Sequence, residues 1–205
     1  RLKTVVVTNA VGKSLKAFAE NYPIVSIQCE PNLVAGNIFS MSADCNGRLA
    51  SRFDTEYVLI VQNDGYPLRK GLDDFVGKFD FIGAPYVRNK LFQQIYCHIF
   101  KTWVMNGGFS LRSHNLCEFA AYHWNKTYSS IGDCRAASED IFYTQTLPQK
   151  EPSFRRRFNL PTTQEALSFS WDALVPIQIP NKLPFGFHRL SSLDIIAENF
   201  KEQLK

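Results

Sequence analysis

The sequence lacks any hydrophobic run near the roughly 18 residues of a membrane-spanning helix. It also lacks internal repeats, low-complexity segments and a change of composition that would mark a linker. We therefore expect one domain over residues 1–205, a length that can bury a sizeable core. No secretory leader is visible, and the chain starts at Arg1 rather than at a methionine, so we expect a domain excised from a longer protein, with fusion to other domains as an option.

Cysteine is sparse and does not occur in CxxC pairs. The number, five, is odd, which argues against a disulfide framework and favours reduced thiols in a cytosolic protein. Three histidines lie near two of the cysteines in sequence, but the spacings fit no tetrahedral zinc site. The cysteines are Cys29, Cys45, Cys97, Cys117 and Cys134, and the histidines are His98, His114 and His123.

An excess of one charge is also missing, since 23 Lys and Arg oppose 19 Asp and Glu. Aromatic residues do not interleave with the basic ones as in a nucleic-acid-binding module, so we expect no nucleic-acid partner. The clearest basic run is Arg155-Arg156-Arg157. A solvated surface is the simpler interpretation, and peripheral contact with a phosphate or a membrane surface is the alternative.

The sequence does contain strand and helix signals in alternation. Short β-branched segments suit buried strands, and the segments between them have a helical period. This order predicts an α/β fold with a mostly parallel central sheet and helices on both faces. The expected strands are 3–8, 24–28, 57–61, 107–112 and 174–179, and the expected helices are 14–21, 43–52, part of 68–79, 113–123, 139–147, one capped by Thr162 or Thr163, and one opened by Ser191-x-x-Asp194.

The strongest strand, Tyr57–Val61, ends in Gln62-Asn63-Asp64-Gly65. Ligands bind at the carboxyl ends of strands in open α/β sheets, and a carboxylate there can hold a hard cation on a diphosphate. Asn-Asp-Gly is equally a strong turn sequence. Both interpretations stay open from this segment alone.

Two other segments contain candidate site residues. Asn106-Gly107-Gly108 provides flexible backbone that can lie close to a ligand, or merely a bulge before a strand. Ser138-Glu139-Asp140 begins a helix, where acidic residues are stabilised by the helix dipole. Asp140 could also be a general base that accepts a proton from a hydroxyl group, with Glu139 orienting the site or holding the acceptor.

His188, in Pro184-Phe185-Gly186-Phe187-His188, is surrounded by aromatic residues, and such a histidine is usually packed in the core. A neutral imidazole would also suit Mn²⁺. Near the N-terminus, Gly12-Lys13-Ser14 resembles the end of a P-loop, but Val7 stands where the first glycine is required. Thr8 and Asn9, which end the first strand, are better placed to contact a nucleotide.

In this order and spacing the segments VQNDGYPL, FIGAPY, NGGFSLRS, SEDIFY and PFGFH resemble GT-A fold glycosyltransferases, and in particular a little-characterised bacterial family of glycosyltransferase-like domains. The resemblance implies a Rossmann-like, three-layer α/β/α fold. It implies transfer of a hexose from a nucleotide-sugar donor to a glycan or lipid-linked glycan acceptor, by inversion and with Mn²⁺ or Mg²⁺. The implied residues are Asp140 and Glu139 for catalysis; Thr8, Asn9, Gln62, Asn63, Asp64, Asn106, Gly107 and Gly108 for the donor; and Asp64 and His188 for the metal.

One position departs from the family pattern, because Gln62 replaces the first acid of the Asp-x-Asp metal motif and supplies no charge. A non-catalytic domain that binds a nucleotide or glycan is therefore the first alternative. A sugar nucleotidyltransferase is the second, although residues 8–14 lack the glycine-rich basic loop that this class needs. The family resemblance implies bacterial surface-polysaccharide synthesis in the cytoplasm, with the inner face of the membrane as an option.

Overall fold

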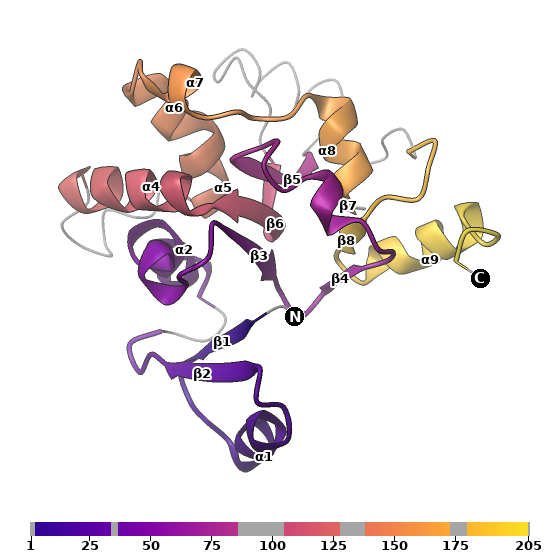
Figure 1. The fold of residues 1–205 in the computed structure, drawn as a ribbon, viewed down its shortest axis with the longest axis horizontal. Coiled ribbons are helices and arrows are strands. Elements are labelled where there is room, and N and C mark those ends of the chain that lie inside the picture. The colour runs from indigo at the N-terminus through magenta and orange to yellow at the C-terminus, as the bar shows by residue number, and fades with distance from the viewer. Residues whose placement is uncertain (1–2, 34–36, 86–104, 128–137, 173–179, 205) are drawn as a thin grey trace.

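A computed structural model describes residues 3–33, 37–85, 105–127, 138–172 and 180–204 of the chain, and the structural statements below concern these residues. The fold is mixed α/β (Figure 1). No helix in these ranges is both long and apolar enough to cross a membrane.

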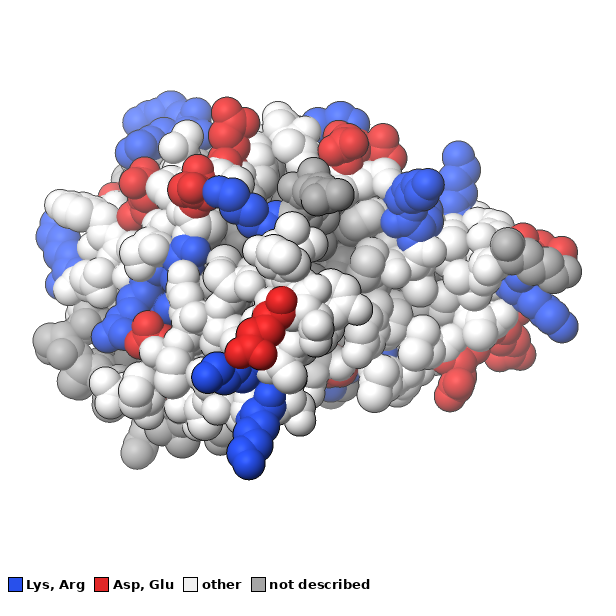
Figure 2. Space-filling view, turned by 60° about the horizontal axis from the view of Figure 1, so that its bottom comes forward, with Lys and Arg blue, Asp and Glu red and all other residues white. Residues whose placement is uncertain are grey.

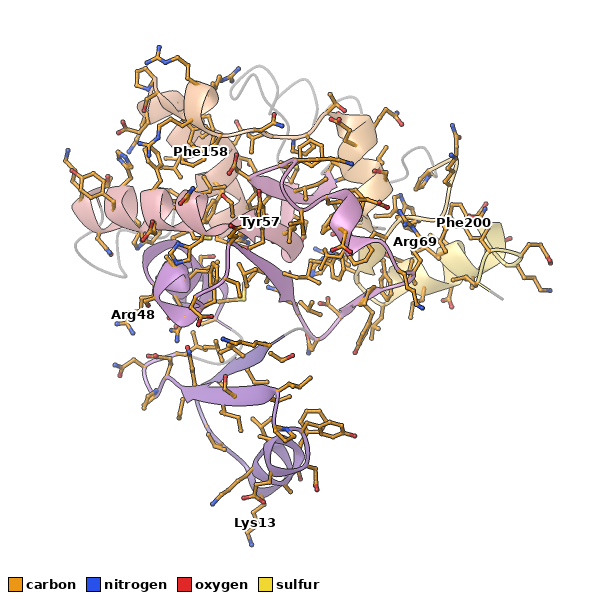
Figure 3. All side chains as sticks on the ribbon, in the orientation of Figure 1. Lys13, Arg48, Tyr57, Arg69, Phe158 and Phe200 are labelled. Atoms are coloured by element: carbon orange, nitrogen blue, oxygen red, sulfur yellow. The ribbon has the colours of Figure 1, made fainter. Side chains whose placement is uncertain are left out.

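The N-terminal unit consists of two parallel strands with a helix between them. β1 (Thr4–Thr8) pairs with β2 (Val25–Cys29), and α1 (Lys13–Asn21) connects them. These elements match the predicted ones to within one residue at each end. Helix α1 buries no residue, and Lys13 points away from the rest of the molecule (Figure 3).

The central sheet has the order β3-β6-β5. β6 (Met105–Ser113) is antiparallel to both β3 (Tyr57–Val61) and β5 (Phe81–Pro85), so the two outer strands run in the same direction. The prediction of a mostly parallel sheet is therefore wrong for the described strands. All of β6 is buried, and burial on both faces does not reveal in which direction a strand runs relative to its neighbours.

A third, smaller sheet has the order β4-β8-β7. β8 (Gly186–His188) is antiparallel to β4 (Gly65–Pro67) and parallel to β7 (Ser170–Asp172). Its pairing places His188 opposite both Gly65 and Asp172. The strand expected at 174–179 lies outside the described residues.

Most predicted helices are present with shifted ends. The cap predicted before α8 is confirmed, because Thr162 and Glu165 form a reciprocal capping box. The capping motif predicted at Ser191 is not formed, since α9 begins there after Leu190 without a side-chain cap. The segment 68–79 contains only a short 3₁₀ turn. The helical elements are α2 (Ile38–Gly47), η1 (Leu49–Arg52), η2 (Leu72–Asp74), α4 (His114–Thr127), α5 (Glu139–Ile141), the π-helical η4 (Phe142–Thr146), α6 (Leu147–Lys150), α7 (Phe154–Arg157), α8 (Thr163–Phe169) and α9 (Ser191–Asn199).

The central sheet is covered on both faces. Phe81 packs with residues of α4, η4 and α7, whereas the next residue of β5, Ile82, packs with an aromatic cluster on the other side. Figure 3 shows Phe158 between α4 and the α6–α7 segment. The sheet that ends in the turn after β3 is therefore packed on both faces.

Three of the cysteines fall in the described ranges, and all three are free thiols: Cys29, Cys45 and Cys117. Cys29 is exposed, and Cys117 is fully buried. Burial raises the pKa of the Cys117 thiol from 9.0 to about 11, although Arg112 and Tyr143 counteract part of this effect. Cys117 is therefore an unreactive core residue rather than a candidate nucleophile.

Candidate active site

The turn after β3 brings its polar side chains to the small sheet. Gly65 N donates to Gln62 O at 3.1 Å, and Gly65 then pairs with His188 across β4 and β8. This tight turn places Gln62 and Asp64 at the imidazole of His188. Two segments more than 120 residues apart in sequence thus meet at the carboxyl end of β3, an outer strand of the central sheet.

His188 presents its Nε2 atom to two oxygen atoms. Nε2 lies 3.3 Å from Asp64 Oδ1 and 3.1 Å from Gln62 Oε1. Met41 Sδ accepts from the Gln62 amide nitrogen at 3.1 Å, which leaves Gln62 Oε1 turned toward the ring. The His188 side chain is buried, whereas Asp64 is 37% exposed, so the carboxylate is open to a ligand.

A residue missed by the sequence analysis holds the other side of the ring. Asp172 Oδ2 accepts from His188 Nδ1 at 3.1 Å and from Asn106 Nδ2 at 3.2 Å. Arg189 Nε donates to Asp172 Oδ1 at 3.1 Å. A single acid within the mainly apolar run 169–175 was the signal that could have identified it, since a buried carboxylate needs partners.

The Asn106-Gly107-Gly108 segment passes between the two halves of the site. Gly108 O accepts from Gln62 N at 2.8 Å, and Gly108 N donates to Asn106 Oδ1 at 2.6 Å. A Cβ on Gly108 would lie well inside 3.0 Å of both His188 Nε2 and Gln62 Oε1. A Cβ on Gly107 would overlap the Glu139 carboxylate in the same way. Both glycines are required by close approach, and the segment brings the predicted donor and catalytic residues together.

Glu139 is engaged by a buried cation. Its Oε1 accepts from Arg112 Nη2 at 3.2 Å, and the guanidinium carbon of Arg112 lies 4.9 Å from the ring centre of Phe81 and 4.7 Å from that of Tyr143. Burial raises the pKa of the Glu139 carboxyl, while Arg112 acts in the opposite direction. Arg112 and Glu139 therefore form a buried ion pair next to Gly107.

Asp140 is more accessible than Glu139. One carboxylate oxygen, Oδ1, accepts from Ser138 Oγ and from Ile141 N, the latter at 2.8 Å. Within the described ranges Oδ2 has no hydrogen-bond partner, so it is the oxygen that can accept a proton. The π-helical turn η4 follows directly, and π-helical insertions are frequent at functional sites.

The first strand is not brought to this cluster. The Thr8 hydroxyl donates to Ala10 O at 2.9 Å, and Asn9 O is 3.7 Å from the Cys29 thiol. β1 pairs only with β2 among the described strands (Figure 1). Asn63 lies in the turn and is exposed, and its carbonyl accepts from the Tyr66 hydroxyl at 3.1 Å.

A metal ion can be accommodated only by a small donor set. In the part of the chain that is described, no three His, Cys, Asp or Glu side chains form a metal-binding group. Asp64 Oδ1, Gln62 Oε1 and His188 Nε2 do converge, however, and carboxylate, amide and imidazole are suitable ligands for Mn²⁺. Mg²⁺ is commonly bound by one or two carboxylates plus substrate phosphates, so this set fits an ion shared with a diphosphate.

Two arginines of the basic run contact different parts of the protein. Arg157 stacks on Phe119 and Phe158, with its guanidinium carbon 4.9 Å and 5.5 Å from the two ring centres. Arg155 lines a mainly apolar cavity of about 340 Å³. On the face in view, Figure 2 shows basic and acidic side chains interspersed, with no broad area of one sign.

Residues 39–188 match a family model described as "Protein of unknown function (DUF5672)". The matched range includes Gln62, Asp64, Asn106, Gly107, Gly108, Glu139, Asp140, Asp172 and His188, and it ends one residue before Arg189. No curated protein and no solved structure is significantly similar to the chain.

Proposed function

The matched range covers most of the chain, so the protein belongs to the DUF5672 family, and we propose that it is a nucleotide-sugar-dependent glycosyltransferase. One observation carries the proposal. A glycine pair lies against a His–Asp–Gln cluster on one side and against the start of an acidic helix on the other. Such a site can hold a charged leaving group and a general base on either side of bare backbone.

On the donor side, Asp64, Gln62 and His188 would hold the cation, Mn²⁺ or Mg²⁺. When bound, such an ion would neutralise the charge that develops on the departing nucleoside diphosphate. Gly107 and Gly108 would let the sugar lie against the backbone. Asn106 keeps this turn in shape through the bond that its Oδ1 accepts from Gly108 N.

On the acceptor side, Asp140 would take the proton of the attacking hydroxyl. The acceptor oxygen forms a bond to the anomeric carbon while the bond from that carbon to the diphosphate oxygen breaks. A single displacement of this kind inverts the anomeric configuration. General-base assistance contributes roughly 10²–10⁴-fold. Glu139, tied to Arg112, fixes the helix start that presents Asp140.

The proposal includes a GT-A-like, three-layer α/β/α fold. Three features support it: the parallel β1–β2 unit, the common direction of β3 and β5, and a sheet packed on both faces. The acceptor class that we propose is a glycan or lipid-linked glycan of bacterial surface-polysaccharide synthesis, on the cytoplasmic side of the membrane.

Calorimetry tests donor binding. A panel of nucleoside diphosphates is titrated with and without Mn²⁺ into wild type, Asp64→Ala and Asp54→Ala. Asp54 is the matched control, because its carboxylate is 77% exposed and pairs with Lys3. We expect Mn²⁺-dependent binding of one nucleotide that is lost only in Asp64→Ala. Binding that ignores both Mn²⁺ and Asp64 would reject the metal role, and no binding of any nucleotide would reject the transferase.

Turnover tests the base. With the matching nucleotide-sugar and saturating acceptor, Asp140→Asn should retain donor binding and lose transfer by about 10²-fold or more. Wild-type turnover in this variant would show that Asp140 is not the base.

A non-catalytic binding domain is the second candidate, and two observations favour it. The first metal-motif position is the neutral Gln62, and Glu139 is occupied by Arg112. Saturable nucleotide-sugar binding without turnover across a broad acceptor panel would select this candidate.

A further inference from the structure

The Asp172 carboxylate, beside the candidate site, accepts hydrogen bonds from three different residues. We propose that Asp172 is a positioning residue: it keeps the proton of His188 on Nδ1, so that Nε2 offers its lone pair to a cation shared with Asp64 and Gln62. This inference rests on the proposed function for its purpose, but not for its test.

The tautomer follows from hydrogen-bond chemistry. An ionised carboxylate only accepts hydrogen bonds, and Asp172 Oδ2 lies 3.1 Å from His188 Nδ1, so Nδ1 must carry a hydrogen. The neutral ring then has a bare Nε2. That atom faces Asp64 Oδ1 at 3.3 Å and Gln62 Oε1 at 3.1 Å, which are also acceptors. These three electron-rich atoms surround one point, which a cation can occupy and for which a second proton on the ring is the competing occupant.

The carboxylate itself is held rigidly. Its side chain is only 2% exposed, and the parallel pairing of β7 with β8 places Asp172 directly opposite His188. Asn106 and Arg189 donate to it from β6 and from the residue after β8. Arg189 has a left-handed backbone (φ 73°), a strained conformation that is found more often near functional sites. A ligating histidine whose other nitrogen donates to a carboxylate is the usual arrangement around protein-bound metals.

A purely structural tie between β6, β7 and β8 makes different predictions. Such a tie would lower stability when broken, but it would leave the ring tautomer and cation binding unchanged. The ¹⁵N spectrum of the imidazoles separates the two roles, because pyrrole-type and pyridine-type nitrogens differ strongly in shift. The chain has only four histidines, and His188→Gln assigns the His188 signals by their loss.

The experiment uses the whole chain without nucleotide. Wild-type His188 should show a protonated Nδ1 and a bare Nε2, and Mn²⁺ should broaden its signals more than those of His114 and His123. In Asp172→Asn the amide can donate to Nδ1, so the population of the Nε2-protonated ring should rise. The affinity for Mn²⁺, measured from the concentration that gives half-maximal broadening, should then fall by about 10–100-fold. Asp80→Asn is the matched control, since Asp80 also accepts two hydrogen bonds, from Ser113 Oγ and Asn159 N.

Several results would overturn the proposal. The first is a wild-type His188 ring that is protonated on Nε2 and unaffected by Mn²⁺. The second is an Asp172→Asn protein with the wild-type tautomer and the wild-type broadening. The third is a loss of Mn²⁺ broadening in Asp80→Asn as large as that in Asp172→Asn. The first result is obtained on the wild-type protein, so the proposal can be tested even if Asp172→Asn does not fold. Neither transfer nor nucleotide binding is measured, so a metal-independent transferase would fail this test and still pass the nucleotide titration.

Discussion

Replacing Gly108 with alanine is the most direct perturbation of the site, because the new methyl group would meet the cluster itself. The added Cβ would be 2.8 Å from Gln62 Cδ and closer still to Gln62 Oε1 and His188 Nε2, whereas ordinary contact starts at 3.4 Å. These atoms must therefore retreat by more than 0.5 Å. The His188 ring cannot do so freely, because Asp172 holds its Nδ1 at 3.1 Å on the other side.

Overpacking of this kind costs about 1–3 kcal/mol of the free energy of unfolding. In a domain of this size each kcal/mol corresponds to a Tm change of about 2–4 °C. Displacement of a site group by roughly 1 Å can cost about 10²-fold in activity. We therefore expect a folded protein with a moderately lower Tm and a much larger loss of Mn²⁺-induced broadening at His188.

Thermal unfolding and the Mn²⁺ titration are measured on the same Gly108→Ala preparation. Gly12→Ala is the matched control, because a Cβ there would meet nothing within 4 Å. Wild-type stability together with wild-type broadening in Gly108→Ala would refute the close approach of the glycine to His188. A loss of the same size in Gly12→Ala would refute its specificity.

Three further predictions concern the supporting structure. Arg112→Met should lower the free energy of unfolding by about 3–5 kcal/mol, because it leaves the Glu139 carboxylate buried without a cation. In denaturant titrations, adding Glu139→Gln should restore most of this loss. A double variant that is no more stable than Arg112→Met would contradict the ion pair. Burial raises the pKa of Cys117 from 9.0 to about 11, so this thiol should lower the free energy of unfolding by up to about 2.7 kcal/mol as pH rises from 9 to 11. In pH-dependent unfolding, Cys117→Ala should remove this part of the slope and leave the part due to Cys45, whose pKa is raised to about 12, whereas Cys29→Ala should leave both parts. Thr162→Ala should cost about 1 kcal/mol in the same unfolding assay by removing a helix cap, and a Thr162→Ser protein that is equally destabilised would argue against the cap.

Local structure was largely predictable from the sequence. The strand Tyr57–Val61 was predicted with the right ends, and the cap at Thr162 follows from a residue pattern that acts over one helical turn. Strand direction was not predictable in this way. β6 is inserted antiparallel between β3 and β5, and nothing in a fully buried strand records the direction of its neighbours.

The site was predictable only in part for a related reason. His188 and Asp64 stand in recognisable segments, whereas Asp172 ends a short buried strand, and its importance appears only when β7 pairs with β8. The glycines at positions 107 and 108 suggested close approach, but the partners, Glu139 and His188, stand in two separate segments much further along the chain. Long-range pairing supplies this information, and no local pattern contains it.

The charge balance of the cluster indicates how the cation and donor should bind. Asp172 already accepts hydrogen bonds from His188, Asn106 and Arg189, so its negative charge is balanced by groups of the protein. Only Asp64 then offers a full negative charge to a cation, because Gln62 is neutral. A divalent ion held by one carboxylate keeps excess positive charge, which a diphosphate can neutralise while it completes the coordination. The cation and the nucleotide should therefore strengthen each other's binding by the same factor, since coupling between two ligands is reciprocal. Equal Mn²⁺ affinity with and without saturating nucleotide would show that they do not share this site.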